Sequence, residues 1–172
     1  MPLAVGLRAS VRAVVSESDT AAALGSGDVP VLGTPRLLAL AEAATVAAVA
    51  PQLALGDTTV GTSVTMEHRR ASPVGSSLVI EAELTEVDGP RLVFSFIARR
   101  ADSSGQPSGA EAPVTQAPAA QAPGSEAPRA QAPGTDASGG DERVVGAGTI
   151  ERVVVSRERF LARAAAHQPG AR

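Results

Sequence analysis

Residues 34–51 read TPRLLALAEAATVAAVAP, and this stretch decides the fold. Leu, Val and Ala dominate it, so a helix formed here is apolar over most of its surface. Thr34 followed by Pro35 is typical of a helix start in which Thr is the N-cap and Pro takes the first helical position. Pro51 ends the run. The sequence therefore predicts one long apolar helix that the rest of the chain must cover.

Segments with strand-like alternation surround this helix. LRASVRAVV (residues 7–15) precedes the helix. Between this strand and the helix lies a connection of small residues with room for one helical turn. Four more segments come after the helix: TTVGTSVTMEHRRA (58–71), SLVIEAELTEVDG (77–89), PRLVFSFIARR (90–100) and ERVVGAGTIERVVV (142–155). SRERFLARAAAHQ (156–168) reads as a short final helix. This order predicts an α+β fold, with one helix on a curved antiparallel meander.

The last two of these strand segments are separated by a Pro/Ala-rich stretch. A triplet of acid or amide, Ala and Pro recurs every five residues from Glu111 to Gln131. With few bulky side chains, this stretch cannot offset its ordering entropy. We expect a single domain from residues 1–101 and 142–165, a disordered insert at 102–141 in a hairpin, and a flexible tail at 166–172. Enlarging a hairpin loop in this way costs only about 2 kcal/mol.

Composition excludes several classes of function. The 15 cationic residues are all Arg, lie scattered and are outnumbered by 18 acids, which argues against nucleic acid as a partner. The longest apolar run, residues 37–49, is interrupted by Glu42 and too short for a membrane span. Cys is absent, and Arg8 and Arg12 break the apolar order of a signal peptide. We expect a cytoplasmic protein that needs no metal or cofactor.

Glu42 is the acid inside the apolar helix. At about 100° per residue, it shares a face with the bulky apolar positions of the helix. These positions are Leu38, Ala39, Thr45, Val46 and Val49. An idle charge is costly in such surroundings, so Glu42 is a candidate general acid or base. The alternative is that Glu42 lies at the rim, where it reaches water or pairs with an Arg.

His68 is the histidine of the predicted domain, since His167 falls in the tail. Strand alternation places His68 with Val64 and Met66 on the face that packs on the helix, and Gly61 on the opposite face. Histidine is a natural proton shuttle near neutral pH. The alternative is a core histidine with satisfied hydrogen bonds and no role in chemistry.

Four segments together resemble the fluoroacetyl-CoA thioesterase family, which has the hot-dog fold of acyl-CoA thioesterases and dehydratases. They are GTPRLLALAEAATVAAVAP, VGTSVTMEHRRASPVG, EAELTEVDGPRLVFSFIARR and VVGAGTIERVVVSRERF. The family carries a Thr, a Glu eight residues later, a strand His followed five residues on by Pro, and a Gly seven residues before the His. Thr34, Glu42, His68, Pro73 and Gly61 match this pattern. The resemblance covers about residues 5–101 and 142–163.

The resemblance implies hydrolysis of an acyl-CoA thioester by a homodimer with a substrate channel at its interface. Thr34, Glu42 and His68 would be the catalytic residues, and the Gly61 N–H would hold the thioester carbonyl. Eight helical residues separate Thr34 from Glu42 by about 12 Å. They can share a site only if Thr34 lies in a loop folded over the helix, or if a partner subunit contributes.

Arg69 and Arg70 follow the histidine and are candidates for contacts to CoA phosphates, unless they are simply a solvated strand end. The fluoroacetate-specific members of the family carry aromatic side chains in the lid before the helix, whereas this lid reads ALGSGDVPVLG. The sequence therefore predicts a different short- or medium-chain acyl group. Two alternatives stay open: a hot-dog hydratase or dehydratase, and an acyl-CoA-binding module without turnover.

Overall fold

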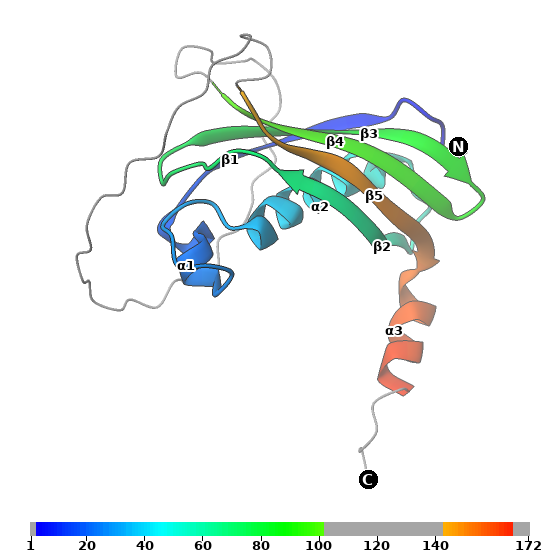
Figure 1. Cartoon of the computed structure of the whole chain (residues 1–172). Coiled ribbons are helices and arrows are strands. Elements are labelled where there is room, and N and C mark those ends of the chain that lie inside the picture. Colours follow the sequence, from blue (N-terminus) through cyan, green and yellow to red (C-terminus); the bar gives the residue numbers. More distant parts are fainter. Residues whose placement is uncertain (1–2, 102–142, 167–172) are drawn as a thin grey trace.

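The computed structural model describes residues 3–101 and 143–166, which form a curved antiparallel sheet with a helix along its inner face (Figure 1). The strands are β1 (Arg8–Val14), β2 (Asp57–His68), β3 (Ser77–Asp88), β4 (Arg91–Arg100) and β5 (Val144–Ser156). The helices are α1 (Ala21–Leu24), α2 (Thr34–Val49) and α3 (Arg157–Ala166), with short 3-10 turns at Glu17–Asp19 and Ala50–Gln52. The predicted element order is confirmed. The predicted disordered insert and nearly all of the predicted tail, with His167, lie outside the described residues.

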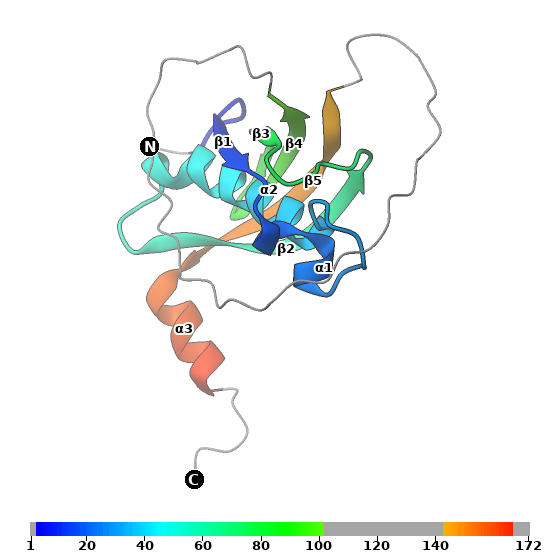
Figure 2. The same cartoon turned by 90° about the vertical axis from the view of Figure 1, so that its left-hand side faces the viewer.

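The sheet has the order β1-β3-β4-β5-β2, and every neighbouring pair is antiparallel. The prediction that all four strands after the helix form a meander is wrong for β2, which pairs with β5 instead of β3; only β3, β4 and β5 form a meander. Figure 2 shows the strands curving around α2, which runs within the concavity. The inward residues of β4 alternate as predicted, and all are buried: Leu92, Phe94, Phe96 and Ala98. The end of β2 lies beside the start of α2, where Thr34 contacts His68.

The buried stripe of α2 packs mainly on β1 and β3. Its members are Leu37, Leu40, Ala41, Ala44, Thr45, Ala48 and Val49. The opposite stripe, which contains Ala39, Ala43 and Val46, is exposed in the single chain. The prediction that bulky apolar residues all lie on one dry face with Glu42 is therefore wrong, because the helix buries a different side. Apolar residues occur on more sides of α2 than the sheet of one chain covers.

A bulge in β2 changes which residues face the helix. The pairing of β2 with β5 shifts between Gly61 and Ser63, which makes Thr62 the extra residue. Residues before a bulge exchange faces relative to simple alternation. Thr59 and Gly61 therefore share the inner face with His68, and the prediction that Gly61 lies on the opposite face is wrong.

β2 is an edge strand whose outer side has no neighbour among the described residues. Residues 61–65 of this strand are all exposed, including the apolar Val64 at 39%. The exposed stripe of α2 carries Val46, also 39% exposed. Long, uncovered edge strands with apolar residues invite pairing with another chain.

α3 continues from β5 and projects away from the sheet (Figure 1). Its first amide, of Arg157, donates to the carbonyl of Gly56, which fixes the start of the helix beside the start of β2. Within residues 3–101 and 143–166, no helix has the length and apolar character needed to cross a membrane.

Candidate active site

Thr34 and His68 meet at the first turn of α2. The Thr34 Oγ1 lies 3.0 Å from His68 Nδ1, within hydrogen-bonding distance. Gly33 occupies the N-cap position and Thr34 is the first residue of the helix, so the predicted N-cap role of Thr34 is wrong. Its hydroxyl is left free for the imidazole. We call this pair the Thr34/His68 dyad.

His68 is partly buried at the end of β2. Burial lowers the pKa of His68, and a hydrogen bond with the backbone of Arg70 offsets this in part. The imidazole is therefore neutral at neutral pH, as a base must be. Nε2 is shielded from solvent and has no hydrogen-bond partner in the described part of the chain. A core histidine with all its hydrogen bonds satisfied does not describe this residue.

The lid, residues 15–33, walls the dyad on one side. Asp19 of the lid forms an ion pair with Arg36 of α2 at 2.7 Å, and the Leu32 amide donates to the Ser72 carbonyl. A pocket of about 260 Å³ lies between the lid and the strand end. It is lined by the dyad, by Arg69 and Arg70, and by small lid residues: Ala21, Ser26, Val29, Val31 and Leu32. The lid is thus attached at both ends, and no aromatic side chain lines its pocket.

Glu42 lies further along α2 and makes different contacts. Its Oε1 is 3.3 Å from Nη1 of Arg152, a residue of β5 that is only 5% exposed. The Glu42 side chain itself is 39% exposed in the single chain. The prediction of a dry carboxylate is therefore wrong for one chain, and the alternative of a pair with an Arg is what the structure shows.

Arg152 is a site residue that the sequence did not reveal. Its Nε donates to Thr59 Oγ1 at 2.9 Å and its Nη2 to the Thr59 carbonyl at 3.0 Å. Burial lowers the pKa of Arg152, and the charge of Glu42 raises it in part. The signal was present as an Arg at an inward position of the segment TIERVVV, but only the bulge in β2 shows that Thr59 faces it.

Gly61 lies against Glu42. A Cβ added at Gly61 would sit 2.5 Å from Glu42 Oε1, closer than any real contact of this kind, and 3.8 Å from Arg152 Nη1. Glycine is therefore the residue that lets the carboxylate approach the β2 backbone. Glu42, Arg152 and Gly61 form one group, which we call the Glu42/Arg152 group.

The structure thus brings the predicted site residues together in two places. Thr34 and His68 are at the start of α2, whereas Glu42 and Gly61 lie about 12 Å further along the helix. Thr34 belongs to the helix, so it does not reach Glu42 by folding back as part of a loop. Within one chain, the predicted set of Thr34, Glu42 and His68 is not assembled.

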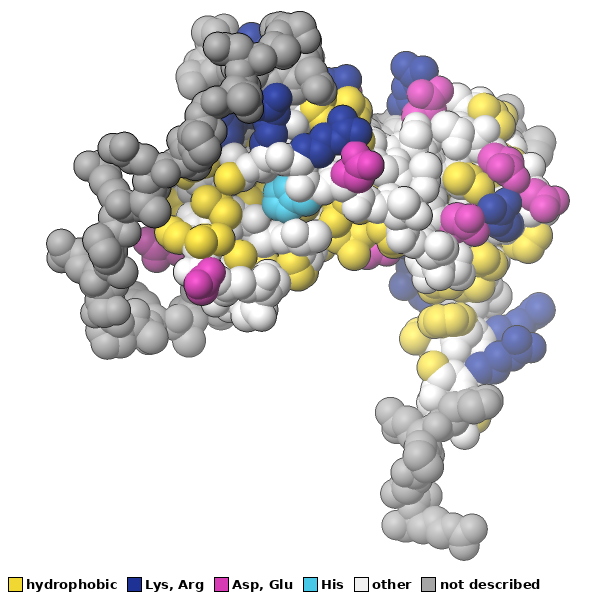
Figure 3. Space-filling view, viewed as in Figure 1, with side chains coloured by type: hydrophobic (Ala, Val, Ile, Leu, Met, Phe, Trp, Pro, Cys, Tyr) yellow, Lys and Arg dark blue, Asp and Glu magenta, His cyan; other side chains and the backbone are white. Residues whose placement is uncertain are grey.

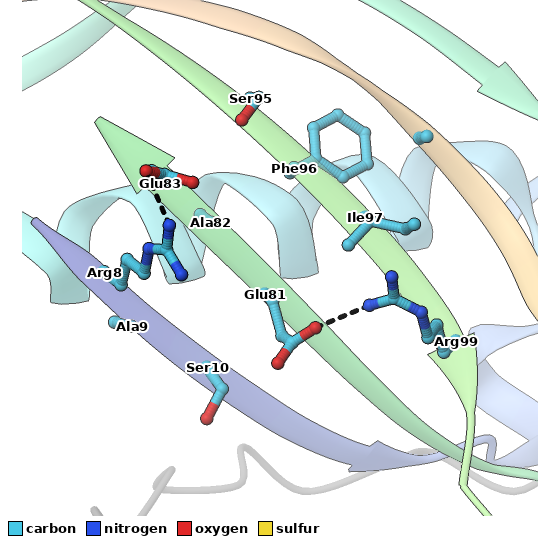
Figure 4. A pocket seen from close by; sticks show the side chains of 11 residues that line it. Arg8, Ala9, Ser10, Glu81, Ala82, Glu83, Ser95, Phe96, Ile97 and Arg99 are labelled. Carbon is cyan, nitrogen blue, oxygen red and sulfur yellow. Dashed lines mark hydrogen bonds and ion pairs between the residues drawn. The ribbon is translucent and has the colours of Figure 1, made fainter. Parts of the chain in front are cut away.

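A larger hollow of about 530 Å³ lies on the outer face of the sheet (Figure 4). Its charged side chains pair with one another across the strands: Arg8 with Glu83 at 2.8 Å and Arg99 with Glu81 at 2.6 Å. Because these charges satisfy each other on a solvated face, the smaller pocket beside the dyad is the better candidate site. No group of three or more potential metal ligands occurs in the described ranges.

A family model matches about half of the chain. Residues 15–104 match the family described as fluoroacetyl-CoA-specific thioesterase, a span that contains the lid, the dyad, Glu42 and Gly61. The chain belongs to this family. The resemblance stated from the sequence motifs is confirmed.

Individual relatives agree with the family match. The fluoroacetyl-CoA thioesterase of Streptantibioticus cattleyicolor is 37% identical over 68 residues, which are 40% of this chain and 49% of that protein. The alignment thus spans about half the length of this curated relative. The solved structure of the fluoroacetyl-CoA thioesterase FlK is 25% identical with a TM-score of 0.69, covering 98% of this chain and 100% of FlK.

A hot-dog-like protein from Thermanaerovibrio acidaminovorans is 19% identical with a TM-score of 0.67, covering 96% of this chain and 93% of that chain. This likeness concerns the fold alone. The predicted hot-dog fold, with an antiparallel sheet around one long helix, is confirmed by both structures.

Proposed function

We propose that this member of the fluoroacetyl-CoA-specific thioesterase family hydrolyses an acyl-CoA thioester to the free acid and CoA. The observation that carries the proposal is the hydrogen bond between Thr34 Oγ1 and His68 Nδ1, which has the distance expected of a nucleophile and its base. It lies in a pocket between lid and sheet, within the span that matches the family.

The chemistry follows from this geometry. His68 Nδ1 accepts the hydroxyl proton as Thr34 Oγ1 attacks the thioester carbonyl, and the C–S bond then breaks. The imidazolium returns the proton to the departing CoA thiolate. Water, deprotonated by the same imidazole, attacks the acyl-threonine ester; the C–O bond to Thr34 breaks, the imidazolium returns the proton to Thr34 Oγ1, and the acid is released. The attack by Thr34 and the attack by water each need a neutral His68 at their start, and burial of the ring favours this form.

The developing oxyanion needs a donor, and the Glu42/Arg152 group is the candidate source. We assign the donor to the Gly61 amide, as the family resemblance implies, with Glu42 orienting the acyl group or a water. This role requires the group to approach the dyad, which it does not do within one chain. A second copy of the chain is therefore part of the proposal.

The exposed edge of β2 is where we place that second copy. A two-fold axis perpendicular to the sheet pairs identical edge strands antiparallel. With the axis near the middle of β2, the Gly61 end of one strand lies towards the His68 end of the other. Both residues are on the inner face of the sheet because of the bulge at Thr62. The same pairing covers the exposed apolar stripe of α2, including Val46.

The lid pocket supports a short- or medium-chain acyl group. The lid side of the pocket carries Ala21, Val29, Val31 and Leu32 and no Phe, Tyr or Trp, so recognition of the acyl chain rests on shape and on a volume of about 260 Å³. We propose that fluoroacetyl selectivity is not a property of this chain.

The test is a panel of acetyl-, butyryl-, hexanoyl-, octanoyl- and fluoroacetyl-CoA, with free thiol as the readout and crotonyl-CoA hydration measured in parallel. Glu42→Gln and His68→Ala should each lower kcat/KM by at least about tenfold while remaining folded. Glu83→Gln, on the outer face, is the matched control. Hydration without thiol release would point to the hydratase alternative, and CoA binding without either reaction would point to a non-catalytic module.

A further inference from the structure

Arginines gather at one end of the sheet, beside the Thr34/His68 dyad. Arg69 and Arg70 follow β2, Arg100 ends β4, and Arg143 precedes β5. Figure 3 shows Arg side chains close to the histidine on this face of the molecule. Among the described residues of this cluster the acid is Glu67, at the end of β2. These described residues together carry a net positive charge next to the candidate site.

The backbone holds these residues in place. The amides of Arg69 and Arg70 both donate to the carbonyl of Val145, at 2.8 and 3.2 Å. The Arg100 amide donates to the Arg143 carbonyl at 2.8 Å, which ties the ends of β4 and β5 together. The loop after β2 is thus fixed to the sheet, so its side chains are presented from a rigid base.

The guanidinium groups differ in what they contact. Arg69 is occupied by Glu67, with Nε and Nη2 at 2.8 and 2.7 Å from the same carboxylate oxygen. Arg70 has no ion-pair partner in the described ranges, and it lines the same pocket as the dyad. Arg100 Nη2 donates to the carbonyl of Ala71, another residue lining that pocket, at 2.8 Å. Arg70 and Arg100 thus flank Ala71, and both retain donors for an anion.

We propose that Arg70 and Arg100 form an anion subsite that binds the phosphate groups of CoA, and that Arg69 does not take part in it. This inference rests on the proposed function and extends it, because it separates Arg70 from Arg69 and adds a residue of β4. A CoA thioester has its reactive carbonyl at one end of the pantetheine arm and its phosphates at the other. A pocket lined by the dyad and Arg70, with Arg100 hydrogen-bonded to its lining residue Ala71, matches that order of groups.

The physical reason for tight binding here is the charge-assisted hydrogen bond. Arginine donates in a fixed planar geometry that fits phosphate oxygens. A hydrogen bond to a charged group contributes roughly 1.5–3 kcal/mol, which corresponds to about 10- to 100-fold in affinity. Since the arginines are exposed, salt should weaken the binding.

The experiment measures binding by calorimetry, with the full chain and without turnover. The ligands are CoA, 3′-dephospho-CoA and pantetheine, and the variants are Arg70→Gln, Arg100→Gln and Arg69→Gln. Arg12→Gln, an exposed arginine on the far edge strand β1, is the matched control. We expect wild type to bind CoA at least about tenfold more tightly than pantetheine. Arg70→Gln and Arg100→Gln should each weaken CoA binding by about tenfold and leave pantetheine binding unchanged.

The outcomes separate this subsite from the proposed function. Equal affinity of wild type for CoA and pantetheine, or an equal loss of both ligands in the Arg70 variant, would overturn the subsite. A loss in Arg69→Gln as large as in Arg70→Gln would overturn the assignment between the two. Thioester hydrolysis that does not depend on Arg70 or Arg100 would leave the proposed function standing alone. Phosphate-dependent CoA binding without any hydrolysis would support the subsite and contradict the proposed function.

Discussion

The start of α2 and its middle differ in how complete they are within one chain. At the start, Thr34 and His68 are in hydrogen-bonding contact and a lid closes over them. In the middle, Glu42 is held by Arg152 and lies against Gly61, yet its side chain is 39% exposed. The first region has the imidazole of His68 and a pocket, and the second has the carboxylate of Glu42 beside Gly61.

This difference shows that the fold of one chain holds two groups of candidate site residues apart. The rise along α2 separates Thr34 from Glu42 by about 12 Å. A glutamate side chain is too short to span that gap. Along β2, the exposed residues 62–65 lie between Gly61 of one group and His68 of the other. The surface that a second copy would cover is therefore also the surface across which the two groups would meet.

The largest effect is expected at Gly61. Gly61→Ala places a methyl 2.5 Å from the present position of Glu42 Oε1, so the carboxylate must move. We expect kcat/KM to fall by about 100-fold, the middle of the range for a misplaced catalytic group, with the fold retained. Glu42→Asp in the same chain shortens the acid and should restore part of the activity. Wild-type rates for Gly61→Ala would separate this glycine from catalysis.

The buried cation should matter for stability more than the acid it holds. Arg152→Met removes two hydrogen bonds to Thr59 and the pair with Glu42. We expect the free energy of unfolding to fall by about 2–3 kcal/mol in urea denaturation. Glu42→Gln should cost less than about 1 kcal/mol, because Glu42 is partly solvated and pairs exposed to water contribute little. The reverse ranking would contradict the view that Arg152 is anchored by Thr59.

The hydroxyl of Thr34 should affect rate without affecting the helix. Gly33 is the N-cap, so Thr34→Val removes the contact to His68 and no capping bond. We expect kcat/KM to fall by about tenfold or more and the melting temperature to stay close to that of wild type. A loss of roughly 1 kcal/mol or more in stability would instead indicate a helix cap.

The smallest expected effect is a shift in the pH at which activity declines on the acid side. Burial lowers the pKa of His68, so the imidazole stays neutral until the pH falls below the ordinary value of about 6.5. Activity should be constant above that value and decline as the pH falls through the pKa of the folded protein. The acid limb of kcat/KM measures this midpoint. A midpoint above about 7 would mean that a charged group outweighs burial at this ring.

The sequence predicts the start of α2, with Thr34 and His68, better than its middle, with Glu42 and Gly61. A Thr at the start of an apolar helix and a His at the end of a strand are local signals, and the fold needs only the right element order to join them. The stripe of α2 that packs on the sheet was missed because Leu, Val and Ala surround the helix on every side, so periodicity does not choose between faces. Burial of Leu37 and Ala44, rather than of the Glu42 face, comes from how the sheet curves.

The inner face of β2 was missed for a related reason. Alternation has a period of two, and the extra residue Thr62 reverses it for everything before the bulge. Gly61 and His68 are an odd number of residues apart, so simple alternation places them on opposite faces. The buried Arg152 depends on the same bulge, because its partner Thr59 faces inward only as a result of it. Neither bulges nor buried cations leave a clear pattern in a single sequence.

The most direct test of the account is complementation between inactive variants. If each site combines the dyad of one chain with Glu42 of another, mixing Glu42→Gln and His68→Ala chains restores one intact site in each mixed dimer. After unfolding and refolding at equal amounts, about half of the dimers are mixed, so about a quarter of wild-type activity should return. Refolding each variant alone is the control and should restore none. Activity that stays at the level of the separate variants, in mixtures shown to contain mixed dimers, would contradict the claim that two chains share each site.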